Sequence, residues 1–287
     1  MEENIVLEEI IDEYIYRSPE NDEIIYSELN NNILAFVSSK NPTYLKIFNI
    51  DEKKIIRTIK TNYKITLIKF NPYDASQFAC ASSASEKKLI IVLENNEPII
   101  HDSTGIINSI VWSPDGNKIA YNSGKDIVIR DLENNILYKT LYGHSKTILS
   151  IDWNNNKIIS GGKDKIIIWD IKNNFSKKEI KNIENNILKL IPNNNYLISY
   201  NYSYIKIFDI DGKLINIIST TFNNYNITFN IYNITFLLNS NKFLCSSKKG
   251  YILFNYNINN IIKINVDSIL LLENKFINFY QNNQNNL

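Results

Sequence analysis

Short apolar runs of four to seven residues recur along the whole chain, separated by clusters of Asn, Asp, Gly, Ser and Lys. Runs of this length that are rich in Ile, Val, Phe and Tyr and bounded by turn residues predict β-strands joined by hairpins. Some runs are apolar at every position, as expected for strands that are buried on both faces. The sequence shows no segment with a 3.6-residue period and helix caps. The pattern therefore predicts an all-β protein.

The predicted strands are grouped in a repeat. The clearest unit is residues 143–170, GHSKTILSIDWNNNKIISGGKDKIIIWD, and its last run has counterparts elsewhere, such as YLKIFN, DIVIRD and YIKIFD. A period near 41 residues is typical of four-stranded propeller blades. The spacings are 44, 38, 39, 39 and 46 residues between the equivalent anchors Phe48, Val92, Arg130, Trp169, Phe208 and Phe254.

The two ends of the chain decide how such a ring closes. Six complete units fill residues 23–266, and about two strands are left over at each end, in residues 1–22 and 267–287. Two strands from each end make a seventh blade, and a ring closed in this way has no exposed edge strands. We therefore expect residues 1–287 to form a single seven-bladed β-propeller of four-stranded antiparallel blades, with the seventh blade shared between the termini.

The unit at residues 143–170 resembles the WD-repeat β-propeller family. The resemblance rests on Gly143-His144 at its start, SGGKD at 160–164 in a turn and Trp169-Asp170 at its end. It covers the whole chain by period and one unit by strict motif, because the other units have Phe-Asn, Val-Leu, Arg-Asp or Phe-Asp in place of Trp-Asp. The segment from residue 107 to 169 also resembles a propeller of a much longer intraflagellar-transport subunit. The family resemblance implies a rigid scaffold that binds other proteins.

His144 is one of only two histidines, which raises the question of catalysis. The family resemblance instead implies a structural network in which His144 bonds to Asp164 and, through Ser160, to Trp169. The SGGKD run lacks the spacing of a phosphate-binding loop and leads into a predicted strand. The sequence offers no cluster with the spacing of a metal site or an acid–base pair. We therefore expect no catalytic, cofactor-binding or metal-binding residues and no small-molecule substrate.

Turns between the second and third strands of each unit carry many lysines. The family resemblance implies that these turns line one face and often bind partners. A basic face would favour an acidic peptide or protein, although lysines in turns also serve solubility alone. The lysines of this candidate face are Lys87, Lys88, Lys125, Lys163, Lys248 and Lys249. A second candidate contact is the Asn-rich, aromatic insertion at residues 220–233.

The net charge of +1 conceals an uneven distribution. Residues 1–28 hold ten acidic residues and one basic residue, so this segment is −9 and the remaining residues carry +10. A basic body allows an alternative function, association with a ribosome or RNA. The 54 Ile and 47 Asn residues are a bias that an A+T-rich coding sequence produces, and they favour strands and turns.

The expected compartment is the cytoplasm, with the nucleus as the alternative. The first residues, MEENIVLEEI, have no cationic region and no long apolar stretch, so they do not predict a secretory signal. The chain has no apolar run long enough for a transmembrane helix, so no membrane insertion is expected. Cys80 and Cys245 have no metal or disulfide spacing and are predicted to be buried free thiols.

Overall fold

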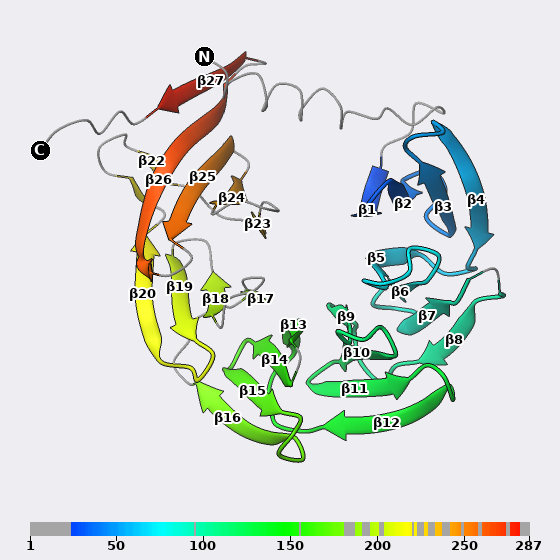
Figure 1. Ribbon diagram of the computed structural model, residues 1–287. Helices are drawn as coiled ribbons and strands as arrows, with labels where there is room; N and C mark the ends of the chain where they lie inside the picture. Colours follow the sequence, from blue (N-terminus) through cyan, green and yellow to red (C-terminus); the bar gives the residue numbers. More distant parts are fainter. Residues whose placement is uncertain are drawn as a thin grey trace, which may run out of the picture. The chain divides into compact units, whose positions relative to one another are not determined.

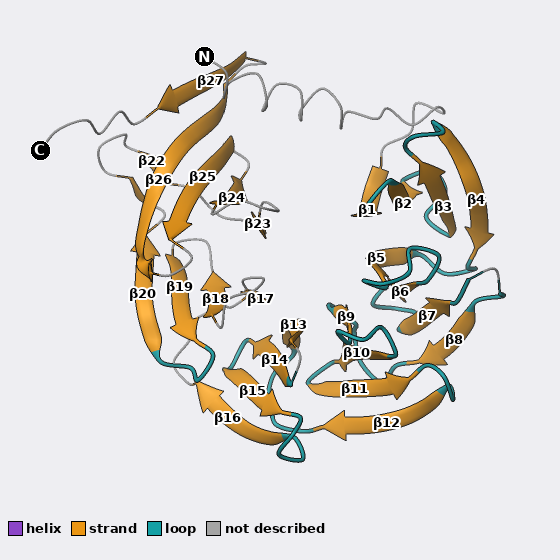
Figure 2. Cartoon of the chain, viewed as in Figure 1, coloured by secondary structure: helices purple, strands orange, loops and turns teal. Residues whose placement is uncertain are grey.

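The computed structural model is all-β throughout the residues that it describes, with strands joined by turns and loops (Figures 1 and 2). The chain divides between Ile119 and Ala120 into two compact units, and each is described by itself. The described residues are 24–94, 96–154, 156–180, 187–190, 196–200, 204–219, 221–222, 227–228, 233–236, 242–247, 250–257, 260–273 and 276–281.

The first unit contains two complete four-stranded sheets, in which consecutive strands pair in antiparallel fashion. Their strand orders are β1-β2-β3-β4 and β5-β6-β7-β8, so each sheet is a simple meander (Figure 1). The strands are β1 (Ile24–Asn30), β2 (Ile33–Ser38), β3 (Tyr44–Asn49), β4 (Lys54–Lys60), β5 (Ile65–Phe70), β6 (Phe78–Ser82), β7 (Lys88–Val92), β8 (Ile99–Asp102) and β9 (Ile110–Trp112).

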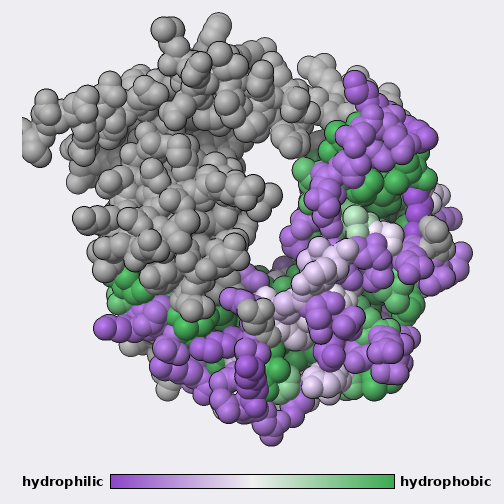
Figure 3. All heavy atoms as spheres, viewed as in Figure 1, coloured by the Kyte–Doolittle hydropathy of each residue, from purple (hydrophilic) through white to green (hydrophobic). Residues whose placement is uncertain are grey.

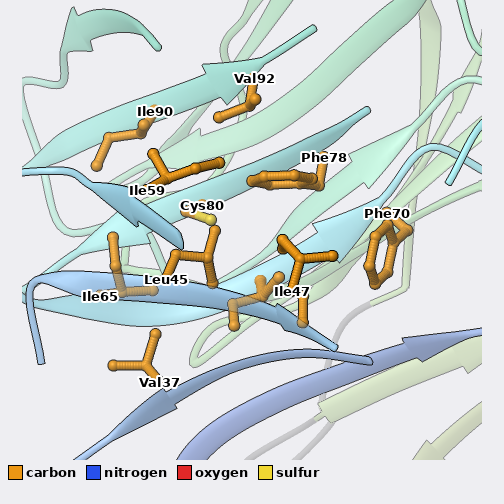
Figure 4. Packing of buried hydrophobic residues seen from close by; sticks show 12 residues of the cluster. Val37, Leu45, Ile47, Ile59, Ile65, Phe70, Phe78, Cys80, Ile90 and Val92 are labelled. Carbon is orange, nitrogen blue, oxygen red and sulfur yellow. The ribbon is translucent and has the colours of Figure 1, made fainter. Parts of the chain in front are cut away.

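The central strands of these sheets are mostly apolar and mostly buried. In β6, FACAS, all five residues are buried, because both faces of the sheet are covered. One cluster joins the two sheets: Leu45 and Ile47 from β3 pack with residues of the second sheet (Figure 4). Phe70 and Phe78 meet edge to face in the same cluster, with ring centroids 5.9 Å apart. Packing between sheets therefore holds this unit together.

The second unit continues the same plan. A sheet of order β12-β11-β10-β9 contains the division between the units, which falls inside β10. Two more four-stranded sheets follow, then a two-stranded hairpin and a five-stranded sheet. The strands are β10 (Lys118–Ser123), β11 (Asp126–Asp131), β12 (Ile136–Leu141), β13 (Ile148–Asn154), β14 (Lys157–Gly162), β15 (Ile166–Asp170), β16 (Ser176–Ile180), β17 (Ile187–Leu190), β18 (Tyr196–Tyr200), β19 (Tyr204–Asp209), β20 (Leu214–Ser219), β21 (Thr221–Phe222), β22 (Ile227–Thr228), β23 (Asn233–Phe236), β24 (Lys242–Ser247), β25 (Gly250–Asn257), β26 (Asn260–Glu273) and β27 (Phe276–Gln281).

Within the second unit, the sheets β13–β16 and β17–β20 share a core. Ile159 and Ile168 of the first sheet pack with Leu197 and Phe208 of the second. Gly212 has a φ of +83° and lies so close to Ile180 that an added Cβ would be 2.7 Å from that side chain. A glycine is required there both by the backbone conformation and by the close approach.

The C-terminal strands differ from the prediction. The predicted boundary between the sixth and seventh blades, at residues 266 and 267, lies inside the single strand β26. β27 then pairs with β26, so both strands belong to the five-stranded sheet that begins with β23. The run INVDSILL has no Gly, Pro or Asn-Gly turn signal at this point, so the strand continues. The N-terminal part of the predicted shared blade, residues 1–22, lies outside the described residues.

The insertion at residues 220–233 contains the short hairpin β21–β22, in which Thr221 pairs with Thr228. A different irregularity recurs in the outer strands. β4, β12 and β20 each contain a β-bulge near the same point of their pairing with the adjacent strand. A bulge adds one unpaired residue and sharpens the local twist of an edge strand.

Candidate functional site

A buried chain of hydrogen bonds links four side chains of the sheet β13–β16. His144 precedes β13, Ser160 lies in β14, Asp164 lies in the turn after β14, and Trp169 lies in β15. The His144 Nδ1 atom is 2.8 Å from Asp164 Oδ1, and His144 Nε2 is 2.8 Å from Ser160 Oγ. Trp169 Nε1–H donates to Ser160 Oγ over 2.9 Å. The network therefore connects a loop, a turn and two strands.

The donors and acceptors fit one direction of hydrogen bonding. Trp169 donates to Ser160, which can donate to His144 Nε2, and His144 Nδ1–H then donates to Asp164. This assignment requires a neutral imidazole. Burial lowers the pKa of His144, and the hydrogen bond to Asp164 offsets this only in part, which agrees with the neutral form.

Asp164 is anchored on both carboxylate oxygens. Besides His144, the backbone N–H and the hydroxyl of Ser145 donate to Oδ2, over 2.7 and 2.9 Å. Burial alone would raise the pKa of Asp164, but the hydrogen bonds from His144 and Ser145 outweigh it and hold the pKa well below its usual range. The carboxylate therefore stays ionised and ties residues 144–145 to the turn after β14.

Two glycines make room for this network. An added Cβ at Gly143 would lie 2.8 Å from the indole of Trp169, and one at Gly162 would lie 2.6 Å from Asp164 Oδ1 and 2.7 Å from His144 Nδ1. The Gly143-His144 pair is thus a steric requirement as well as a motif, because the backbone must pass directly over the tryptophan.

The geometry gives this network no means of nucleophilic catalysis, although Ser160, His144 and Asp164 stand in the order of a catalytic triad. Ser160 and His144 are buried, and the Ser160 hydroxyl already accepts from Trp169. A nucleophile must reach a substrate, and a hydroxyl enclosed in the core cannot. What the arrangement can do is hold the loop before β13 against the sheet.

The candidate basic face is described in part. In the first unit, Lys87 ends the turn before β7, and Lys88 begins β7. Lys88 forms an ion pair with Asp102 of β8, and its ammonium lies 5.6 Å from the centre of the Tyr63 ring. The hydrogen bond to Asp102 raises the pKa of Lys88. The ammonium of Lys88 is therefore already paired with a carboxylate within the same sheet.

In the second unit the structure brings two of the predicted lysines together. Lys125 and Lys163 are exposed, and the loop before β13 runs between their turns. Ile148 N–H donates to Gly124 O over 3.0 Å, and Lys163 N–H donates to Thr147 O over 3.3 Å. The turns that carry Lys125 and Lys163 are therefore held on either side of the same loop.

Lys146, on that loop, was not among the predicted residues. It is exposed and lies between the two turns, so Lys125, Lys146 and Lys163 form one basic group. The sequence signal for Lys146 was its place two residues after His144, in the loop that the network anchors. Lys248 and Lys249, also predicted for this face, lie outside the described residues.

Trp112 and Cys80 are two further buried side chains of the first unit. Trp112 is buried and its indole N–H donates to Lys69 O over 3.0 Å, so it joins β9 to β5. Cys80 is a buried free thiol in β6, and burial raises its pKa.

The described residues hold no group of three or more His, Cys, Asp or Glu side chains that could bind a metal ion. In the same residues, there is no helix long and apolar enough to cross a membrane. In the view of Figure 3, hydrophilic residues cover much of the coloured surface, with apolar residues visible between them.

Residues 135–170 match the family model described as "WD domain, G-beta repeat". This segment runs from the turn before β12 to the end of β15 and includes the whole network. Two solved structures are similar to the chain over most of its length, at 10% sequence identity. "Structure of U3-55K" has a TM-score of 0.72 and covers 89% of each chain, and "Crystal structure of RRP9 WD40 repeats" has a TM-score of 0.71 and covers 89% of this chain and 88% of the other. These likenesses show the fold.

Curated relatives match a shorter stretch. The chain is 32% identical over 78 residues to the "Intraflagellar transport protein 80 homolog" of Rattus norvegicus and to that of Mus musculus. The match covers 23% of this chain and 10% of either relative, so the chain spans about a tenth of the length of these proteins.

Proposed function

Since the chain is a divergent member of the WD-repeat family, we propose that it is a non-enzymatic scaffold, or a subunit of a multiprotein complex, inside the cell. The observation that carries this proposal is the group of exposed lysines Lys125, Lys146 and Lys163, which rigid backbone contacts hold around one loop. A rigid scaffold that presents its binding residues on loops is suited to partner recognition.

The chemistry of this group favours an acidic partner. Asp164, the acidic residue within the Lys163 turn, is hydrogen-bonded by His144 and Ser145, and its single negative charge offsets only one of the three lysines. Exposed cations of this kind raise the association rate and the specificity for an acidic protein or peptide more than the final affinity.

The absence of an enzymatic role is also a proposal. It is supported by the enclosure of Ser160 and His144, which leaves the most triad-like group of the described residues without access to a substrate. A test is to screen the intact chain for hydrolysis of generic ester and peptide substrates. Turnover that Ser160→Ala abolishes would refute the proposal.

The experiment that tests the scaffold proposal is affinity purification of the intact chain with and without charge reversal. Lys125→Glu, Lys146→Glu and Lys163→Glu together should remove most partners that the wild-type chain recovers, because an acidic surface would meet like charge. A matched control reverses Lys53 and Lys213, which are also exposed but lie in the turns before β4 and β20. Undiminished recovery by the triple variant would refute the basic surface.

The alternative proposal is association with RNA or a ribosome, favoured by the charge of +10 carried outside residues 1–28. Binding to phosphates weakens steeply as salt rises, because counterions are released. Recovery of partners after ribonuclease treatment, at both 50 and 200 mM salt, separates the two proposals. Loss of all partners on ribonuclease treatment would favour RNA.

We also propose that the chain closes as a ring of seven blades, with residues 1–22 completing the last one. Support comes from the repeat period and from the likeness to WD40-repeat structures over 89% of the chain. Deletion of residues 1–22 should then lower the melting temperature, because a sheet edge would be exposed. An unchanged melting temperature would refute the shared blade.

A further inference from the structure

The outer strand β12 presents an apolar edge. Ile136, Leu137 and Tyr138 are 55%, 56% and 48% exposed, and β12 is the last strand of its sheet, paired with β11 alone among the described strands. An edge strand has backbone N–H and C=O groups open to pairing, and charged side chains usually protect it. In the next sheet, β16 carries such protection in its sequence SKKEI. In β12, ILYKTL, Lys139 is the single charged residue.

A strained turn extends this apolar edge. Ser176 N–H donates to Asn173 O over 3.0 Å, and between them Asn174 and Phe175 have φ angles of 51° and 58°. Two successive positive φ angles define a type I′ turn, in which Gly is strongly preferred and a bulky residue is strained. A strained residue persists where surrounding contacts hold it, and such residues cluster at functional sites.

The contacts of Phe175 are with β12. Its ring meets that of Tyr138 edge to face, with centroids 6.4 Å apart and planes at 65°, and the ammonium of Lys139 lies 5.6 Å from its centre. The turn thus places an aromatic ring beside the exposed residues of β12 and fixes the position of the one cation on that strand.

We propose that β12, together with Phe175, binds an extended acidic peptide segment of another protein as an added strand. The backbone edge supplies hydrogen bonds, and the exposed apolar side chains supply pockets for alternate residues of the peptide. This surface is separate from the turn lysines of the proposed function.

The positive charges around β12 favour an acidic peptide over a second copy of the chain. Lys139, Lys172 on the Phe175 turn and Lys178 on β16 form no ion pair among the described residues, and Lys172 and Lys178 are exposed. A second copy of the chain would bring the same lysines to its side of the interface, where like charges repel. An extended segment with carboxylates would instead neutralise them.

The strand β4 of the first unit corresponds to β12, but the cation at the position of Lys139 is bound by carbonyl groups of the same unit. In β4 the bulged residue is Ile56, as Tyr138 is in β12, and Arg57 holds the place of Lys139. The guanidinium of Arg57 donates to the carbonyl of Glu94 and, over 3.2 Å, to that of Asn96. The counterpart of Lys139 is therefore used internally in β4, and the exposed cations of that strand, Lys54 and Lys60, lie only at its two ends.

The test uses the intact chain and three synthetic, fluorescently labelled eight-residue peptides. The first alternates Glu with Val and Ile, the second has Lys in place of Glu, and the third is the first with two central Pro residues, which remove N–H donors. Fluorescence anisotropy should show that the acidic peptide binds at least tenfold more tightly than the other two.

Variants of the chain locate the binding. Leu137→Lys and Lys139→Glu should each weaken binding of the acidic peptide at least tenfold. Ile55→Lys is the matched change in β4, because Ile55 follows the same pairing there as Leu137 does in β12, and it should leave binding unchanged. Phe175→Gly should weaken binding about fivefold without lowering the melting temperature, because it removes the ring and relieves the turn. Far-UV circular dichroism checks that each variant is folded.

Three outcomes would overturn the proposal. The first is no binding, or equal binding of the acidic and basic peptides. The second is binding that survives Leu137→Lys and Lys139→Glu in folded protein. The third is a dimer in sedimentation experiments that Leu137→Lys dissolves, which would make a second copy the occupant.

Discussion

The sheets β13–β16 and β17–β20 have the same strand order, and their central strands pair in the same register, but among the described residues only the first has a closed polar network. Trp169 pairs with Ile158, and Ser160 follows two residues later. In the next sheet Phe208 pairs with Leu197, and Ser199 follows two residues later. Ser199 is therefore the counterpart of Ser160, placed beside a ring that has no N–H to donate.

The consequence is visible in the hydrogen bonds. Ser160 Oγ bonds to both His144 and Trp169, whereas Ser199 Oγ is buried and has no hydrogen-bond partner among the described residues. Both sheets form nonetheless, and they share a core. The comparison indicates that apolar packing forms each sheet, and that the network adds stability locally at the loop before β13.

The largest expected effect comes from breaking the network at its charged end. Asp164→Ala leaves the Nδ1–H of His144 and both donors of Ser145 without their acceptor, so we expect a loss of about 3 kcal/mol in the free energy of unfolding. Denaturant titration measures it. Asp211→Ala is the control, since this side chain is 74% exposed and its ion pair with Lys157 spans 3.4 Å, and it should cost under about 0.5 kcal/mol. An unchanged midpoint for Asp164→Ala would contradict the network.

The next largest loss of stability is expected when Trp169 of β15 is replaced by the residue type at the corresponding position of β19. Trp169→Phe reproduces the residue found at Phe208, removes the donor to Ser160 and leaves a small cavity, for an expected loss of about 2 kcal/mol. Combining it with Ser160→Ala in a double-mutant cycle should show a coupling energy of about 1 kcal/mol. Strict additivity of the two changes would show that the hydrogen bond contributes nothing.

The network should also make stability depend on pH. Burial lowers the pKa of His144 below its ordinary value of 6.5, so the folded state binds a proton less readily than the unfolded state. The stability contributed by the neutral imidazole is therefore complete above pH 6.5. It is lost as the pH falls from there through the pKa of His144 in the folded state. Unfolding measured from pH 8 to pH 5 should show a steeper decline for the wild type than for His144→Gln. The same pH dependence of stability in both proteins would contradict the assignment of a buried neutral imidazole.

The smallest effect is expected at the unpartnered hydroxyl. Ser199→Ala removes a buried polar atom that has no partner among the described residues, so stability should stay unchanged or rise by up to about 1 kcal/mol. Ser160→Ala, the same change in the other sheet, should instead cost about 1 to 2 kcal/mol. Equal losses at the two sites would mean that Ser199 is satisfied after all.

Much of the fold follows from local sequence. The apolar runs predicted the strands because each is short, bounded by turn residues and matched in length to its neighbours. The strand β26 shows the limit of this approach. Its two halves, IIKINV and SILLLE, look like separate strands. Their pairing with β25 and β27 shows instead one strand that continues through residue 267, with a bulge at that residue.

The sequence predicted the residues of the buried network better than the contacts of the surface lysines. His144, Ser160, Asp164 and Trp169 could be named because a motif fixes their spacing. Lys146 could not, because its role depends on backbone hydrogen bonds that bring the loop beside two turns. The ion pair that takes up Lys88 was equally hidden, since Asp102 lies 14 residues away on the next strand. Contacts across strands carry no signature in the linear sequence.

The reactivity of the Cys80 thiol can be used to measure local unfolding of the first unit. The thiol lies wholly buried between the sheets β1–β4 and β5–β8, and its raised pKa suppresses the reactive thiolate. Alkylation of Cys80 therefore has to wait until those sheets separate, so its rate in a Cys245→Ser background follows the local unfolding of this unit. The same reagent would distinguish a partner that tightens the first unit from one that leaves it unchanged, without any added label.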